Sequence, residues 1–198
     1  MNGIVSTLQR RQGLDYKINF GVEIPRLKAI AQEYLKDKEL ATTLWHDNIR
    51  ECKLLAIFLL PQEHYSELAK EWVTEAPFTE IADHLTMNIL CKLPTATTDA
   101  LEWLGCDKGL SKYCGYLTLT HIFRKGTTLT PSEEQAFFNH VTTLFAGCSD
   151  KLLTRIAFTA LCKYIDLGSY STEQIEALAK TNEQLAVMIK NYIGEEEL

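Results

Sequence analysis

Apolar residues recur at spacings of three and four along almost the whole chain. This spacing places them on one face of a helix, and the alternating pattern that is typical of strands is missing. The sequence therefore predicts a nearly all-α fold. We expect helices over residues 2–12, 25–37, 39–45, 48–60, 63–75, 78–93, 97–105, 111–124, 131–146, 150–166, 172–180 and 183–193.

Residues that favour helix N-termini support several of these boundaries. In "LTPSEEQAF", Thr130 precedes Pro131 and Glu133, the arrangement of an N-cap, a proline at the first helical position and a capping-box glutamate. Ser149 and Ser171 precede two further predicted helices and are expected N-caps. Because the connections are short, consecutive helices should be antiparallel neighbours.

An apolar segment recurs in the second helix of successive pairs. The copies are "LLAIFLLP" at 54–61, "MNILCKLP" at 87–94, "YLTLTHIF" at 116–123 and "AFTALCKYI" at 157–165, and the first two end in Leu-Pro at an offset of 33 residues. Helix pairs that recur every roughly 30 to 45 residues are typical of HEAT-like α-solenoids. We expect a single HEAT-like repeat domain over residues 1–198, with about six antiparallel pairs. An irregular helical bundle predicts the same local periodicity.

Composition places the chain among ordinary soluble proteins. It has 198 residues, of which 46% are hydrophobic. Only the acidic tail "GEEEL" at 194–198 is expected to be disordered. The N-terminus lacks an apolar core of signal-peptide length, and no apolar stretch approaches the roughly 20 residues that span a bilayer. We therefore expect a cytoplasmic protein that is not in a membrane.

The six cysteines are expected to be reduced thiols, since no C-x-x-C pair occurs and a cytosolic location is predicted. His84 with Cys91, and Cys114 with His121, are each seven residues apart, so each pair shares one helix face. Two potential ligands per helix do not make the four-ligand set of a structural site. We expect no metal site and no cofactor.

The net charge of −6 and the pI of about 5.4 argue mildly against a general nucleic-acid coat protein. They leave room for a local basic surface, because contacts with phosphates depend on where the individual Lys and Arg side chains lie. Composition alone does not identify the partner.

Two stretches resemble the N-terminal signature of the DNA alkylation repair family of the AlkD type. They are "NFGVEIPRLKAIAQEY" at 19–34 and "LATTLWHDNIRECKLLAIFLL" at 40–60. The resemblance implies a solenoid whose concave face holds duplex DNA, alkylated or structured, and in the best-known members the removal of cationic N3- or N7-alkylated purines. The signature also has a structural interpretation, in which Gly21 adopts a positive φ, Pro25 presets a first helical turn and Trp45 fills a repeat junction.

Asp83 is the candidate catalytic residue. At about 100° per residue, it falls off the apolar stripe of helix 78–93, together with Thr79, Met87 and Leu90. The resemblance implies that this carboxylate stabilises the oxocarbenium character that develops on the sugar as the glycosidic bond breaks. The alternative is a solvated or structural acid.

The partners that the family would place around this aspartate are replaced. Thr79 lies where a tryptophan is expected, with Phe78 as the nearest aromatic substitute. Thr159 and Cys162 lie where a later tryptophan and its arginine are expected, and Tyr113 beside Lys112 lies where another arginine is expected. These departures favour a divergent, non-catalytic member.

The candidate DNA-binding residues are cationic or aromatic side chains of the second helices: Lys53, Lys112, Tyr113, Arg155 and Lys163. Arg155 belongs to a second stripe of helix 150–166 that also contains Cys162 and Asp166. The cations would contact phosphates if they share one surface, and are otherwise solubilising charges. We therefore expect binding of duplex DNA on the concave face. The alternatives are a DNA-structure binder without chemistry and a scaffold that binds a protein partner on that face.

Overall fold

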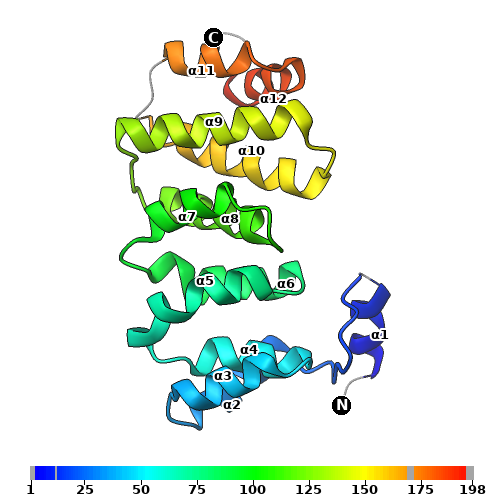
Figure 1. The fold of residues 1–198 in the computed structure, drawn as a ribbon. Helices are drawn as coiled ribbons and strands as arrows, with labels where there is room; N and C mark the ends of the chain where they lie inside the picture. Colours follow the sequence, from blue (N-terminus) through cyan, green and yellow to red (C-terminus); the bar gives the residue numbers. More distant parts are fainter. Residues whose placement is uncertain (1–2, 12, 169–171, 195–198) are drawn as a thin grey trace. The chain divides into compact units, whose positions relative to one another are not determined.

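The computed structural model describes residues 3–11, 13–168 and 172–194. Over these residues the chain is helical (Figure 1). Within them, one isolated parallel bridge joins Ile18 and Ile49. The α-helices are α1 (Gly3–Arg11), α2 (Ile24–Gln32), α3 (Lys38–His46), α4 (Arg50–Leu59), α5 (Tyr65–Glu75), α6 (Thr79–Asn88), α7 (Ala96–Leu104), α8 (Ser111–Arg124), α9 (Pro131–Gly147), α10 (Lys151–Ile165), α11 (Thr172–Ala179) and α12 (Glu183–Ile193), and the short 3₁₀ turns are η1 (Gln62–His64) and η2 (Leu90–Lys92). The predicted all-α fold is confirmed.

Each copy of the repeated Leu-Pro dipeptide ends helical backbone in the same way, after α4 in the first pair and after η2 in the second. Leu60, before Pro61, and Leu93, before Pro94, both have extended backbones, with φ −64° and ψ 128° for the first and φ −65° and ψ 138° for the second. A residue before proline is disfavoured in the α region. The helix expected over 78–93 was too long, because Ile89, with φ −123° and ψ −64°, leaves the α region, so that α6 ends at Asn88 and the η2 turn follows.

The predicted N-caps have different outcomes. Thr130 caps α9 in a full capping box, because its hydroxyl accepts a hydrogen bond from the Glu133 N–H and the Glu133 carboxylate accepts one from the Thr130 N–H. Ser149 was the wrong residue, since Asp150 caps α10 by accepting from the N–H groups of the second and third helical residues. Ser171 lies outside the described residues, as do residues 195–198 of the acidic tail.

The chain divides into two compact units, residues 1–93 and 94–198. In the first unit, α4 packs between α2 and α6, so these three helices form one layer, which we call the α2–α4–α6 layer. Helices α3 and α5 pack on α4 and α6 from the other side. Trp45 of α3 stacks on Trp72 of α5 with ring centroids 4.3 Å apart, and both side chains are 0% exposed. Trp45 thus fills a junction between successive helix pairs, as its position in the signature predicted.

The second unit repeats this plan. Helix α8 packs on α10, and α7 packs on α9. Helices α8 and α10 thus form one layer, and α7 and α9 form the other. Each of the pairs α7–α8 and α9–α10 joins a helix of one layer to a helix of the other. Phe123, Phe137 and Tyr164 form an aromatic cluster between them, with centroid distances of 5.0 to 5.9 Å. The α11–α12 pair follows, and Asn182 donates a hydrogen bond to the Phe145 carbonyl at the end of α9. Both units therefore have the paired, layered helices of a helical-repeat fold.

None of the helices in the described ranges combines the length and the apolar character that a membrane span requires.

Candidate functional site

Asp83 lies on α6 in the α2–α4–α6 layer. Its neighbours Ile81, Ala82 and Leu85 are fully buried, whereas Asp83 is half-buried and Met87 is 54% exposed. Asp83 is therefore off the core stripe, as its helical position predicted. Leu90 was expected on the same side but is fully buried, because the α-helix ends two residues before it.

Phe78 packs on the segment that precedes α2. It is the N-cap residue of α6, and its ring meets Tyr16 edge to face, with centroids 4.5 Å apart. Tyr16 is buried, and its hydroxyl donates a hydrogen bond to Glu80 at 3.3 Å. The aromatic side chain nearest to Asp83 in the sequence thus helps to hold the N-terminal segment on α6.

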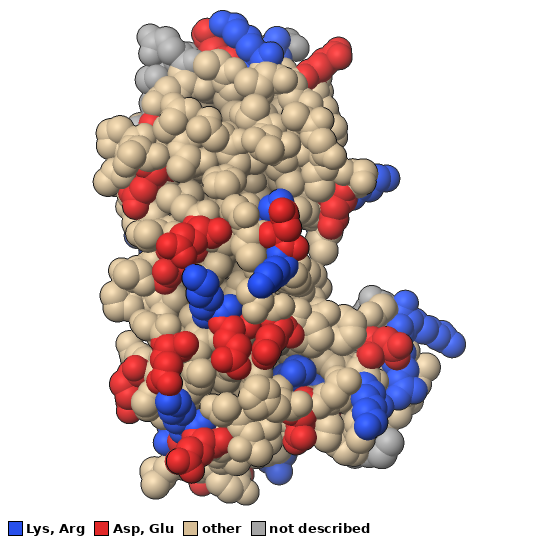
Figure 2. Space-filling view, viewed as in Figure 1, with Lys and Arg blue, Asp and Glu red and all other residues tan. Residues whose placement is uncertain are grey.

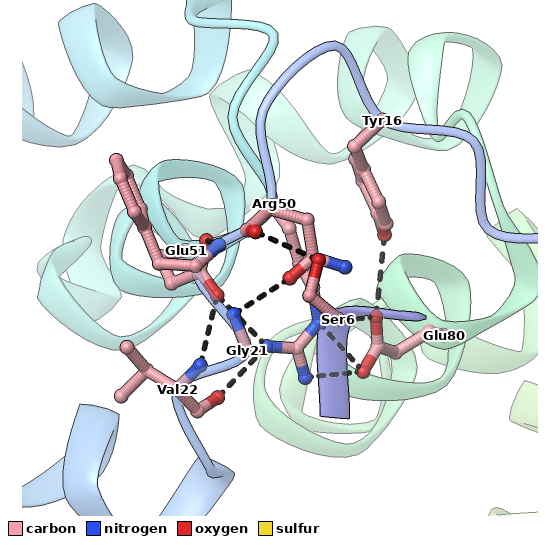
Figure 3. Close-up of polar contacts among 9 residues, drawn as sticks. Ser6, Tyr16, Gly21, Val22, Arg50, Glu51 and Glu80 are labelled. Atoms are coloured by element: carbon pink, nitrogen blue, oxygen red, sulfur yellow. Dashed lines mark hydrogen bonds and ion pairs between the residues drawn. The ribbon is translucent and has the colours of Figure 1, made fainter. Parts of the chain in front are cut away.

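A buried ion-pair network lies one turn before Asp83 (Figure 3). Arg50, which is 2% exposed, donates to both carboxylate oxygens of Glu80 at 2.9 Å and 2.6 Å and to the Val22 carbonyl at 2.8 Å. Burial alone would lower the pKa of Arg50, but the hydrogen bonds and charges of Glu80 and Glu51 outweigh burial and raise it. The guanidinium is thereby kept charged and fixed between α4, α6 and the N-terminal segment.

Glu51 ties the sequence signature to the same network. Its carboxylate accepts hydrogen bonds from the backbone N–H groups of Phe20 at 3.2 Å and Val22 at 3.1 Å. Between them, Gly21 has φ 68° and donates to the Asn19 side chain at 2.9 Å. The Phe-Gly-Val and Arg-Glu parts of the signature therefore bind each other. These contacts support the structural interpretation of the signature. The link to Glu80 was not predicted from the sequence.

Lys53 lies in the interior and not on the expected phosphate-facing surface. Its ammonium donates to the Trp45 carbonyl at 2.6 Å and lies 4.8 Å from the centroid of the Trp45 ring. Burial lowers the pKa of Lys53, with Glu75 and Asp47 opposing that shift. The side chain faces inward because α4 presents this position to the end of α3.

A basic hollow of about 360 Å³ lies in the first unit between the ends of α2, α4 and α6. We call it the lysine hollow. Its polar and aromatic walls include Lys28, Gln32, Tyr34, Lys36, Phe58 and Lys92. In the part of the chain that the structure describes, no Asp or Glu lines it. These lysines were not among the predicted binding residues, because α2, α4 and η2 bring them together only in the fold.

His84 links the helix of Asp83 to the lysine hollow. Its ring meets Phe58 edge to face, with centroids 5.9 Å apart, and the Lys28 ammonium lies 5.6 Å from the centroid of the same Phe58 ring. The His84 Nδ1 atom is buried and has no hydrogen-bond partner among the described residues. Burial lowers the pKa of His84, with the Glu80 charge opposing the shift. The imidazole is therefore held in its neutral form near neutral pH.

The remaining predicted DNA-binding residues lie in the second unit. Lys112 and Tyr113 are half-buried at the start of α8 and line a hollow of about 240 Å³, and Lys112 pairs with Asp107. Arg155 on α10 is exposed, and Lys163 on the same helix pairs with Asp166. The fold thus brings Lys112 and Tyr113 together at one hollow and places Arg155 and Lys163 along α10.

Cys162 corrects the predicted second stripe of α10. It is 5% exposed, and burial raises the pKa of its thiol to about 12. It therefore lies in the core, away from the exposed side of the helix that carries Arg155. Within the described ranges, no three His, Cys, Asp or Glu side chains come together in a group that would hold a metal ion.

Figure 2 shows one face of each unit. Over the first unit, Lys and Arg side chains are interspersed with Asp and Glu, whereas the surface over α9 carries few charges. In this unit, Lys38 of α3 pairs with Glu67 of α5 at 2.5 Å. Mixed charges of this kind attract phosphates weakly, so the residues of interest for an anion are those without acidic neighbours.

The comparisons with known proteins identify one family. The model of the family described as DNA alkylation repair enzyme matches residues 15–146. Neither the curated proteins nor the solved structures that were searched gave a match. The matched region includes the buried Arg50 network, Asp83 and the start of the second unit through most of α9.

Proposed function

The chain belongs to the DNA alkylation repair enzyme family, and on that premise we propose that it binds duplex DNA, alkylated or structured, through the second helices of its repeats. The observation that carries the proposal is the polar side of these helices. In the first unit it presents Asp83, and in the second unit it presents Lys112, Tyr113 and Arg155 outside the core. Arg155 is exposed and Lys112 is half-buried, and cations at fixed helix positions are the side chains that contact phosphates.

We propose that binding occurs without efficient release of the damaged base. A carboxylate that stabilises an oxocarbenium ion needs groups that hold the sugar and the flanking phosphates in place. Thr79 and Thr159 are half-buried and offer no aromatic face, and Cys162 is buried in the core. Where no aromatic or cationic side chain holds the sugar and phosphates in place, the charge of Asp83 would repel phosphates more than it assists the chemistry.

The proposal is tested by titrating the protein with a short duplex and measuring release of methylated bases from the same duplex after alkylation. We expect binding that weakens steeply with salt, because displaced counterions set the slope, and we expect base release at background level. An absence of duplex binding at low salt would overturn the proposal and favour a protein-binding scaffold. Robust release would show that the protein is an active glycosylase.

The substitution Asp83→Asn distinguishes a non-catalytic DNA binder from an active glycosylase. In a non-catalytic binder, the variant should keep the parent's helicity and bind duplex as well as the parent or slightly better, since a like charge is removed. In an active enzyme it should lose most base release, because a cationic N7-methylated purine is already a good leaving group and the carboxylate carries the electrostatic stabilisation. Release that is unaffected by the substitution would place the chemistry on other residues.

Lys112→Ala combined with Arg155→Ala tests the contribution of the second unit. We expect lower duplex affinity and a salt dependence flattened by roughly one unit of slope per lost phosphate contact. Lys180→Ala combined with Lys190→Ala, which removes the same charge from α12 and the end of α11, is the matched control. Equal affinities and slopes for the two double variants would show that Lys112 and Arg155 do not contact DNA.

A further inference from the structure

The lysine hollow concentrates positive charge in an acidic protein. The chain carries a net charge of −6, yet Lys28, Lys36 and Lys92 converge on one hollow of about 360 Å³. All three side chains are exposed. Bringing three ammonium groups together without an acid raises their mutual repulsion, and a bound anion relieves it.

These lysines differ from others whose charge is matched within the fold. Lys38, Lys112, Lys163 and Lys180 each pair with an Asp or Glu side chain. By contrast, Lys28, Lys36 and Lys92 form no ion pair with any residue that the structure describes. Their charge is therefore available to a ligand.

The walls of the hollow hold part of this charge in position. The Lys28 ammonium lies over the Phe58 ring, and the His84 ring also contacts Phe58, edge to face. The Lys36 ammonium lies 3.5 Å from the Leu60 carbonyl. A cation held over an aromatic ring loses less freedom when it binds an anion. Gln32 and Asn88 add amide groups to the lining.

We propose that the lysine hollow is a phosphate subsite, which takes a backbone phosphate of bound DNA and places the attached sugar against Tyr34 and Phe58. The proposal rests on the proposed function for the identity of the ligand. Three cations and amide donors suit the phosphate, and the two aromatic side chains offer apolar surface to the deoxyribose. The contact between His84 and Phe58 connects the hollow to α6, so the phosphate would be held beside the helix that carries Asp83.

The first experiment compares two double variants of the full chain in duplex titrations. Lys28→Gln with Lys92→Gln removes two cations from the hollow. Lys17→Gln with Lys70→Gln removes the same charge from exposed positions that do not line it. We expect the hollow variant to lose about tenfold in affinity at low salt and to flatten the salt dependence by about one unit of slope. The control variant should stay within about twofold of the parent, and circular dichroism should show the same helicity for all three.

The second experiment uses lysine acetylation as a footprint, with duplex and inorganic tripolyphosphate as separate probes. Both should protect Lys28, Lys36 and Lys92 from acetylation and leave Lys70 reactive. Protection by tripolyphosphate without any duplex binding would refute the proposed function but support a phosphate site for free anions. Duplex binding that leaves the three lysines reactive and treats both double variants alike would overturn the subsite and leave the proposed function standing. Protection by neither probe would also overturn the subsite.

Discussion

Arg50 is a buried cation that holds the segment before α2 against α4 and α6. Its guanidinium joins α4 to Glu80 on α6 and to the backbone of the segment before α2. The desolvation of a buried charge is offset only when its hydrogen bonds are satisfied, and here Glu80, Glu51 and the Val22 carbonyl satisfy them. Removing the Arg50 guanidinium leaves the carboxylates of Glu51 and Glu80 without this cation.

Arg50→Met should therefore destabilise the protein strongly. Leaving Glu80 without its partner should lower the free energy of unfolding by about 3–5 kcal/mol, measured by urea denaturation. Lys38→Met removes an exposed ion-pair partner of Glu67 and serves as the control, since such pairs contribute little. Similar losses for both variants would contradict the interpretation of Arg50 as a buried anchor.

His84 should make stability depend on pH. Burial lowers its pKa below the usual value of 6.5, so the unfolded chain binds the proton more tightly than the folded protein. Stability from this group is thus present above the unfolded pKa and is lost as the pH falls below it. His84→Phe keeps a ring against Phe58 and removes the titration. Its free energy of unfolding should fall less than that of the parent between about pH 7 and about pH 5. An equal fall would assign the pH dependence to other groups.

Individual site residues could be predicted only where one helix decides their environment. The position of Asp83 off the core stripe follows from the apolar spacing of α6 alone. Lys53 was misplaced because its burial depends on Trp45, eight residues earlier on another helix. Lys28 and Lys92 were missed for the same reason, since they are far apart in sequence and meet only through α4 and α6.

At the scale of elements, the apolar periodicity predicted the helices well because each one buries a continuous stripe. Their ends depend on single residues. Proline after Leu60 ends α4, proline after Leu93 ends the η2 turn that follows α6, and Asp150 replaces Ser149 as a cap because its carboxylate reaches two N–H groups. Backbone rules therefore explain the boundaries that periodicity left open.

Gly115 allows α8 to approach α7 closely. A Cβ atom there would lie 2.8 Å from the Ala100 carbonyl oxygen and 2.8 Å from a methyl carbon of Leu104. Because backbone cannot move aside as easily as a side chain, Gly115→Ala should lower the free energy of unfolding by about 1–3 kcal/mol. Gly147→Ala on α9, which meets nothing within 4 Å, should be neutral or slightly stabilising. Equal effects in thermal unfolding would show that α7 and α8 are not closely packed at this position.

At the scale of the whole molecule, the chain contains two compact units, whereas the sequence predicted one repeat domain. The family match runs from residue 15 to residue 146 and so continues through the boundary after Leu93. The Leu-Pro repeat also extends up to that boundary. In repeat proteins, neighbouring pairs stabilise one another, so unfolding spreads along the chain. We therefore expect one cooperative unfolding transition.

Arg50→Met in the first unit and Gly115→Ala in the second unit test this expectation by calorimetry. If residues 1–198 form one domain, each variant should lower the midpoint of a single transition, and the calorimetric and van't Hoff enthalpies should agree. If the units unfold independently, the parent should show two transitions, and each variant should shift only the transition of its own unit. That second result would contradict the single-domain prediction. It would also mean that duplex binding engages two domains that fold independently.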